Sequence, residues 1–247
     1  MNLIIDAGNT QIKWAFFQKG DIVEKNACHS WEEFALGEWK NHLSIVDACI
    51  VSTTRKLWPD LEVIMKRESV PVFLLNHELP MPLKLEYKTP ETLGLDRIAG
   101  AAGAIASYPG EHVLIIDMGT AITFDFVSAD GSFRGGNISP GLDIRFQSLN
   151  RYTDNLPLAS FNENAGSFGQ STMEAIESGV QSSIYFEVIG YINSLKNKYN
   201  GLRVILTGGA AEFFVRKLKK TIFVDPNLVL KGLDHILEFQ KKDRVGR

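Results

Sequence analysis

A short polar segment near the start of the chain has the composition of a phosphate-binding turn. It consists of Asp6-Ala7-Gly8-Asn9-Thr10-Gln11-Ile12-Lys13 and follows the apolar run Leu3-Ile4-Ile5. Gly8 lets a ligand approach the backbone, the Asn9 and Thr10 side chains and nearby N–H groups can donate hydrogen bonds, and Lys13 adds positive charge. Asp6 repels phosphate, so its expected role is to hold the divalent ion that accompanies one. Taken alone, the segment also fits a plain hairpin with a polar turn.

The same pattern occurs a second time in the chain. Leu3-Ile4-Ile5-Asp6-Ala7-Gly8 recurs as Leu114-Ile115-Ile116-Asp117-Met118-Gly119, and Thr120 follows. The repetition favours phosphate binding over a plain hairpin and predicts two copies of one structural unit. Two such turns can bind a triphosphate from both sides, whereas the sequence contains neither a Walker loop nor a Rossmann fingerprint.

Three further segments are candidates for binding or catalysis. The adjacent glycines of Thr207-Gly208-Gly209 permit a flat ligand such as adenine to lie against the backbone, with tight packing as the alternative. Asp96 and Arg97 precede a helix of small residues at 98–106, and this pair can take a proton from a hydroxyl and bind an anionic substrate. A surface ion pair is the alternative there. The stretch 153–169 is predicted to be a loop, with a lid or substrate wall as the alternative.

Apolar patterning predicts an α/β protein made of two similar halves. Each half begins with a strand, a hairpin turn and two more strands, and continues as strands alternating with helices. A long helix is expected at 171–199 from apolar residues at three- and four-residue spacing. We therefore predict two βββαβαβα-type domains, at 1–110 and 111–247, that flank a cleft. Beyond the two repeats, the expected turns are 19–21 and 129–131, and the expected strands are 22–26, 48–52, 70–75, 132–138, 203–207 and 222–224.

The composition is that of an ordinary globular protein with small-molecule chemistry. Hydrophobic residues make up 45% of the 247 residues and charged residues 22%, and the net charge of −3 gives no electrostatic footprint for nucleic acid or an anionic membrane. The start of the chain lacks the features of a signal peptide, and no apolar run is long enough to span a bilayer, so a cytoplasmic protein is expected. Cys28 and Cys49 lack the spacing of a zinc site and are expected to be reduced and structural.

Together these motifs resemble the type III pantothenate kinases, which share a superfamily with acetate kinase, hexokinase, Hsp70 and actin. The matching segments span nearly the whole chain in family order: 6–10, 94–97, 116–120, 135–141 and 207–209. The resemblance implies a duplicated ribonuclease H-like fold, the actin-like ATPase fold. It also implies ATP-dependent phosphorylation of pantothenate at its terminal hydroxyl, the first step towards coenzyme A.

The resemblance further implies a role for individual residues. Asp96 would accept the hydroxyl proton, and Asp117 would coordinate a monovalent cation, potassium or ammonium, in addition to the Mg²⁺ that arrives with ATP. Thr172 would reach the pantothenate site across a homodimer interface. Neither Thr172 nor Tyr87 lies in a local sequence pattern that indicates binding. The nucleotide phosphates would be held by Asp6, Ala7, Gly8, Asn9, Thr10, Gln11, Ile12, Lys13 and Thr120, and pantothenate by Tyr87, Gly94, Leu95, Asp96, Arg97 and Thr172.

The chain departs from the family pattern in two small ways, and two other functions compete. Lys13 sits where the family's turn varies, and the region after Gly201 is short. Another small-molecule kinase of the superfamily is one alternative, although such chains usually carry insertions that are missing here. A non-catalytic transcription accessory factor is the other, but the sequence shows no helix-turn-helix or basic stripe and retains Asp6 and Asp96.

Overall fold

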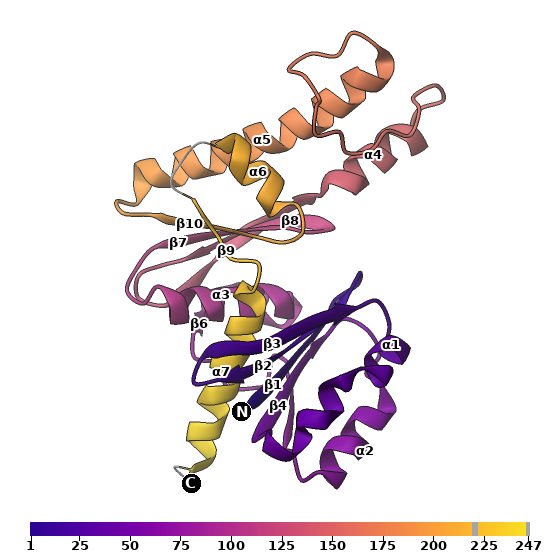
Figure 1. Cartoon of the computed structure of the whole chain (residues 1–247). Helices are drawn as coiled ribbons and strands as arrows, with labels where there is room; N and C mark the ends of the chain where they lie inside the picture. The colour runs from indigo at the N-terminus through magenta and orange to yellow at the C-terminus, as the bar shows by residue number, and fades with distance from the viewer. Residues whose placement is uncertain (219–221, 246–247) are drawn as a thin grey trace. The chain divides into compact units, whose positions relative to one another are not determined.

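The chain forms two compact units, and each is made of more than one segment of the sequence. In the computed structural model, which describes residues 1–218 and 222–245, the first unit comprises Met1–Pro109, Gly131–Phe133 and Asn227–Arg247 (Figure 1). The second unit comprises Gly110–Asp130 and Arg134–Pro226. These units differ from the predicted halves because the last helix joins the first unit. The predicted division into domains at 1–110 and 111–247 stays a prediction.

The first unit contains a five-stranded sheet in the order β3-β2-β1-β4-β5. Strand β1 is antiparallel to β2 and parallel to β4. The strands are β1 Asn2–Ala7, β2 Ile12–Gln18, β3 Asp21–Cys28, β4 Ala48–Thr53 and β5 Val72–Leu74, and a short strand β6 Lys84–Leu85 follows. The helices are α1 Trp31–Leu36, α2 Pro59–Arg67, α3 Leu95–Ser107 and α7 Leu228–Val245, with 3₁₀ turns η1 Glu38–Ile45 and η2 Pro90–Thr92.

Both faces of this sheet are covered, because successive strand residues point to opposite sides. Leu3 and Ile5 pack with α1 and α2 on one face, while Ile4 packs with α3 and α7 on the other (Figure 1). A side chain at Gly232 of α7 would place its Cβ 1.7 Å from the Ala99 carbonyl oxygen, so glycine is required for the close approach of α7 to α3. The central strand is therefore held rigidly between two helical layers.

The second unit repeats this topology. Its sheet runs β11-β10-β7-β8-β9, so that β7 has the central position that β1 has in the first sheet. Like β1, β7 is antiparallel to the strand that follows it, β8, and parallel to its other neighbour, β10. β6 pairs in parallel with Ser132 and Phe133 of β9, residues that belong to the first unit. The elements are β7 Val113–Met118, β8 Ala121–Val127, β9 Ser132–Pro140, α4 Leu142–Arg151, α5 Thr172–Lys198, β10 Arg203–Thr207, α6 Ala211–Leu218 and β11 Phe223–Val224.

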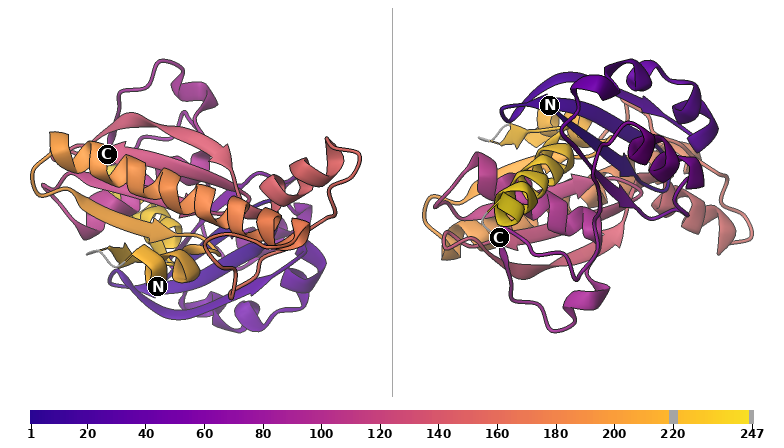
Figure 2. Two further views of the ribbon diagram at one scale, coloured as in Figure 1. Left: turned by 90° about the horizontal axis from the view of Figure 1, so that it is seen from above. Right: turned by 90° about the horizontal axis from the view of Figure 1, so that it is seen from below.

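The long predicted helix is confirmed as α5. It begins where the Ser171 side chain accepts a hydrogen bond from the Glu174 N–H, and its apolar face packs on one face of the second sheet (Figures 1 and 2). The predicted hairpins and strands are also confirmed, and 153–169 has no regular structure. Among the helices that the structure describes, none is long and apolar enough to cross a membrane.

Candidate functional site

The first Asp-x-Gly turn joins β1 to β2 in the first unit. Ala7 ends β1 and Ile12 begins β2, so Gly8 to Gln11 form the connection, with the Asn9 and Thr10 side chains exposed. The antiparallel register places Asp6 opposite Lys13, and the parallel register places it beside Ser52 of β4. The turn thus combines exposed donor groups with a lysine and a carboxylate at its base.

The carboxyl group of Asp6 has a strongly perturbed environment. Burial raises the pKa of Asp6 to about 6, against the opposing effect of the Lys13 charge. The negative charge of Asp96 raises this pKa further, while a hydrogen bond with Ser52 lowers it. Asp6 and Asp96 both belong to the first unit, and the charge of Asp96 acts on the Asp6 carboxyl group.

Asp96 lies in the first turn of α3 and is exposed to solvent. Its Oδ1 accepts a hydrogen bond from the Arg97 N–H at 2.8 Å. A Cβ at Gly94 would lie 2.5 Å from the same oxygen, so the glycine at the helix start leaves room for this carboxylate. An exposed carboxylate fixed at a helix N-terminus is suited to accept a proton from a bound hydroxyl group.

The structure also brings Arg97 and Tyr87 together. The Arg97 side chain is buried, and its guanidinium carbon lies 6.0 Å from the centre of the Tyr87 ring and 5.7 Å from that of Phe133. The loop before α3 is anchored by the Nε2 of His77, which donates to the Leu93 carbonyl oxygen at 2.7 Å. Among the predicted pantothenate-binding residues, Tyr87 therefore lies beside Arg97, and Gly94 lies beside Asp96.

The second Asp-x-Gly turn follows β7 in the second unit, and backbone hydrogen bonds help to hold it. The Gly141 N–H donates to the Thr120 carbonyl oxygen at 3.0 Å, and the Ala210 N–H donates to that of Met118 at 3.2 Å. Gly208 has a φ of +87°, and a Cβ there would lie 2.4 Å from Asp117 Oδ1. The glycine after β10 therefore leaves space beside the Asp117 carboxylate.

Thr172 occupies a different part of the second unit. It is the first residue of α5, is exposed, and lines a cavity of about 470 Å³ with Arg145 and Leu149 of α4. This cavity is formed by the two helices and not by the ends of the strands. A role for Thr172 in substrate binding therefore depends on the predicted homodimer.

Comparison with known proteins decides the family. Residues 2–195 match the family model described as "Type III pantothenate kinase". A type III pantothenate kinase from Phocaeicola vulgatus is 43% identical over 246 residues, which cover 98% of this chain and 100% of the relative. The chain belongs to the type III pantothenate kinase family.

Solved structures agree with the predicted fold. A Campylobacter jejuni protein assigned to the Baf family of transcriptional activators has a TM-score of 0.64 at 20% identity, covering 97% of this chain and 99% of that one. A Listeria monocytogenes protein described as an N-acetylmannosamine kinase has a TM-score of 0.54 at 14% identity, with 97% and 99% covered. These likenesses concern the fold alone, and they confirm the duplicated actin-like architecture.

In this member of the pantothenate kinase family, sequence reasoning missed the loop after β4. Ser52 contacts Asp6, and the side chains of Thr54 and Arg55 hydrogen-bond to the first turn. A signal was present, because β4 was predicted as a strand and the polar run Ser52-Thr53-Thr54-Arg55 follows it. Parallel strands end at the same edge of a sheet, so this run had to lie beside the end of β1.

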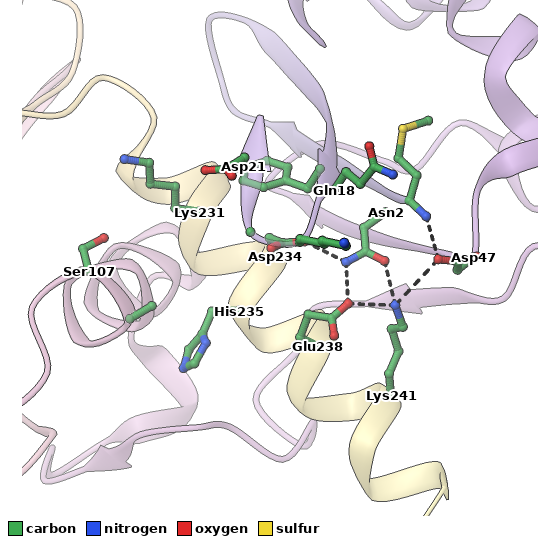
Figure 3. A pocket seen from close by; sticks show the side chains of 15 residues that line it. Asn2, Gln18, Asp21, Asp47, Ser107, Lys231, Asp234, His235, Glu238 and Lys241 are labelled. Atoms are coloured by element: carbon green, nitrogen blue, oxygen red, sulfur yellow. Dashed lines mark hydrogen bonds and ion pairs between the residues drawn. The ribbon is translucent and has the colours of Figure 1, made fainter. Parts of the chain in front are cut away.

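The charged cavity of Figure 3 belongs to another part of the first unit. It has a volume of about 690 Å³ and is lined by the start of β1, the β2–β3 hairpin and α7. There the Met1 amino group pairs with Asp47 at 2.6 Å, and Asn2 donates to Asp234 at 2.7 Å. Because Asn2 and Asp6 are four residues apart on one strand, this cavity is about 13 Å from the phosphate turn along β1.

Proposed function

We propose that the protein uses ATP to phosphorylate pantothenate on its terminal hydroxyl group, the first step of coenzyme A biosynthesis. Its membership of the type III pantothenate kinase family supports this activity. The observation that carries the proposal is the position of two carboxylates of the first unit: Asp6 at the base of the polar turn after β1, and Asp96 at the start of α3, where the Arg97 N–H fixes its Oδ1.

In this proposal the nucleotide phosphates are bound by residues Asp6 to Lys13 of the first turn and by Thr120 of the second. Lys13 supplies positive charge, and the exposed Asn9 and Thr10 side chains can donate hydrogen bonds to phosphate oxygens. Asp6 is suited to hold Mg²⁺, since this ion is usually bound by one or two carboxylates together with substrate phosphates. Bound Mg²⁺ would neutralise charge that develops on the phosphates.

Pantothenate is bound by Tyr87 and by Gly94, Leu95, Asp96 and Arg97. The Arg97 guanidinium is suited to an anionic acceptor, and it lies over the Tyr87 ring. Asp96 accepts the proton of the terminal hydroxyl as that oxygen bonds to the γ-phosphorus. The bond from this phosphorus to the bridging oxygen breaks, and ADP leaves.

Asp117 coordinates a monovalent cation, potassium or ammonium. Its carboxylate has space on the side of Gly208, where any larger residue would place a Cβ within 2.4 Å. The carbonyl oxygens of Gly119 and Thr120 belong to the same turn, and each lies 2.4 Å from where a Cβ of Gly141 would be. Carbonyl and carboxylate oxygens are the ligands that potassium prefers.

The active form is a homodimer in which Thr172 contributes to the pantothenate site of the other copy. The second unit exposes large apolar side chains around α5, notably Phe168 at 92% and Phe186 at 68% exposure. Both line a cavity of about 870 Å³, and exposed apolar groups of this kind mark interaction surfaces. We place the enzyme in the cytoplasm, where its substrate ATP is available.

A coupled ADP-release assay against a panel of hydroxyl acceptors tests the activity. Pantothenate should support turnover far above that of acetate, sugars or no acceptor, and mass spectrometry should find one added phosphoryl group on pantothenate. Turnover that is independent of pantothenate, or faster with a sugar, would overturn the proposal.

A further inference from the structure

Arg55 makes three hydrogen bonds to backbone carbonyl oxygens, and two of them belong to the phosphate turn. Its Nε donates to Gly8 O at 2.6 Å and its Nη2 to Asn9 O at 2.7 Å. Its Nη1 donates to His29 O, just after β3, at 2.8 Å. The planar fork of an arginine can satisfy several acceptors at fixed angles, which a lysine ammonium cannot do.

The loop that carries Arg55 is itself held in place. The Thr53 hydroxyl accepts from the Arg55 N–H at 3.0 Å and donates to the Arg55 carbonyl oxygen at 2.9 Å. The Thr54 hydroxyl donates to Asn9 Oδ1 at 3.1 Å, and the Thr54 N–H donates to Ala7 O at 3.1 Å. The end of β4 and the turn after β1 therefore form one hydrogen-bonded assembly.

These contacts set the direction in which the turn presents its N–H groups. In a planar trans peptide the C=O of one residue and the N–H of the next point in opposite directions. Since the carbonyls of Gly8 and Asn9 point towards Arg55, the N–H groups of Asn9 and Thr10 point away from it. Successive N–H groups on one side of a turn form a concave anion-binding site, and the carbonyl oxygens that would repel a phosphate are on the opposite side.

We infer that Arg55 is a positioning residue for the ATP phosphates, acting through the turn without touching the nucleotide. The inference rests on the proposed role of the first turn in phosphate binding. Arg55 should therefore affect the binding of the nucleotide but not that of pantothenate. In the described hydrogen bonds it contacts the phosphate turn and His29, and it does not contact the proposed pantothenate-binding residues Tyr87 and Arg97.

Steady-state kinetics of Arg55→Lys and Arg55→Ala test this assignment. Because displaced N–H groups weaken the charge-assisted hydrogen bonds to the bound phosphates, we expect KM for MgATP to rise about 10- to 100-fold. KM for pantothenate should stay within about twofold, and calorimetry should show a parallel loss of MgADP affinity. Arg67→Ala is the matched control, since this arginine lies in the same unit with its side chain 84% exposed, and its kinetics should be unchanged.

Thr54→Val provides a second variant in case the Arg55 variants do not fold. It removes one link to the turn at an exposed position and should raise KM for MgATP by about threefold or more without changing KM for pantothenate. Equal increases of both KM values, or a wild-type KM for MgATP in folded Arg55→Lys, would overturn the inference. Absence of pantothenate-dependent turnover in the wild-type enzyme would instead overturn the proposed function, so the two failures are distinguishable.

Discussion

The two Asp-x-Gly turns have the same backbone plan but different surroundings. β1 and β7 show the same burial pattern, with four buried residues, a half-buried aspartate and another buried residue. Each is flanked by an antiparallel strand on one side and a parallel strand on the other. The duplication therefore preserved the positions of Asp6 and Asp117 in their sheets.

The residues that neighbour the two carboxylates differ in charge. Asp6 pairs in register with Lys13 and Ser52, whereas Asp117 pairs with Thr123 and Thr207. A lysine beside Asp6 already offsets part of its charge, while the corresponding position beside Asp117 is neutral. The proposed ligand of Mg²⁺, Asp6, and the proposed ligand of a monovalent cation, Asp117, therefore have neighbours of different charge.

The two turns are also supported in different ways. Side chains of the loop after β4, above all Arg55, hydrogen-bond to the first turn, while backbone N–H groups and closely packed glycines contact the second. A turn held by side chains can be altered by changing one residue outside it. A turn held by glycines is sensitive to any added Cβ.

The proposed catalytic base, Asp96, lies in the first unit, so its removal should have the largest effect. Asp96→Asn should lower kcat by about 10²- to 10⁴-fold with MgATP affinity nearly unchanged, because positioned base catalysis contributes on that scale. Asp143→Asn is a matched control, since Gly141-Leu142-Asp143 begins α4 as Gly94-Leu95-Asp96 begins α3. Comparable losses in both variants would show that the two helix starts are not functionally distinct.

The glycine support of the second turn is tested by adding one methyl group. Gly208→Ala should lower the free energy of unfolding by about 2 to 4 kcal/mol, since φ is +87° and the Cβ would meet Asp117 and the Met118 backbone. Gly209→Ala, with nothing within 4 Å and no positive φ, should change it by less than about 1 kcal/mol. Urea unfolding measures both, and equal effects would contradict the close packing at Gly208.

The environment of Asp6 should make the ligand-free protein less stable above pH 6. The folded protein keeps this proton up to a pKa of about 6, whereas the unfolded chain releases it near 3.8, so stability falls as the pH rises between these values. Asp6→Asn should therefore increase the free energy of unfolding at pH 8 by up to about 3 kcal/mol, although it should inactivate the enzyme. This gain should disappear below pH 4. A destabilised variant at pH 8 would show that the burial of Asp6 has no net cost.

The smallest effect concerns the cation at Asp117. Replacing potassium with sodium at constant ionic strength should lower kcat by about tenfold, because the smaller ion fits an oxygen cage of fixed size poorly. In Asp117→Asn the difference between the two salts should vanish. Equal rates in both salts at saturating MgATP and pantothenate would contradict the assignment of a monovalent cation to Asp117. The two turns would then lack this functional difference.

Much of the fold was predictable because its signals are local. An apolar strand followed by Asp-x-Gly is visible twice in the sequence, and the hairpins and the long helix follow from turn residues and from apolar spacing. The predicted site residues are likewise placed at strand ends and at a helix start, where backbone groups and charges are exposed. These features depend on residues within a few positions of one another.

Tertiary structure alone decided the rest, because contacts between distant segments leave no periodic signal. The place of α7 in the first unit depends on the contact of Gly232 with Ala99, two residues far apart in the sequence. Tyr87 and Arg97 carried no sign of their contact, which depends on the fold of the loop before α3. Arg55 is one of many arginines in the sequence. It acts on the turn after β1 only because β4 pairs in parallel with β1 and brings two segments more than 40 residues apart to one edge of the sheet.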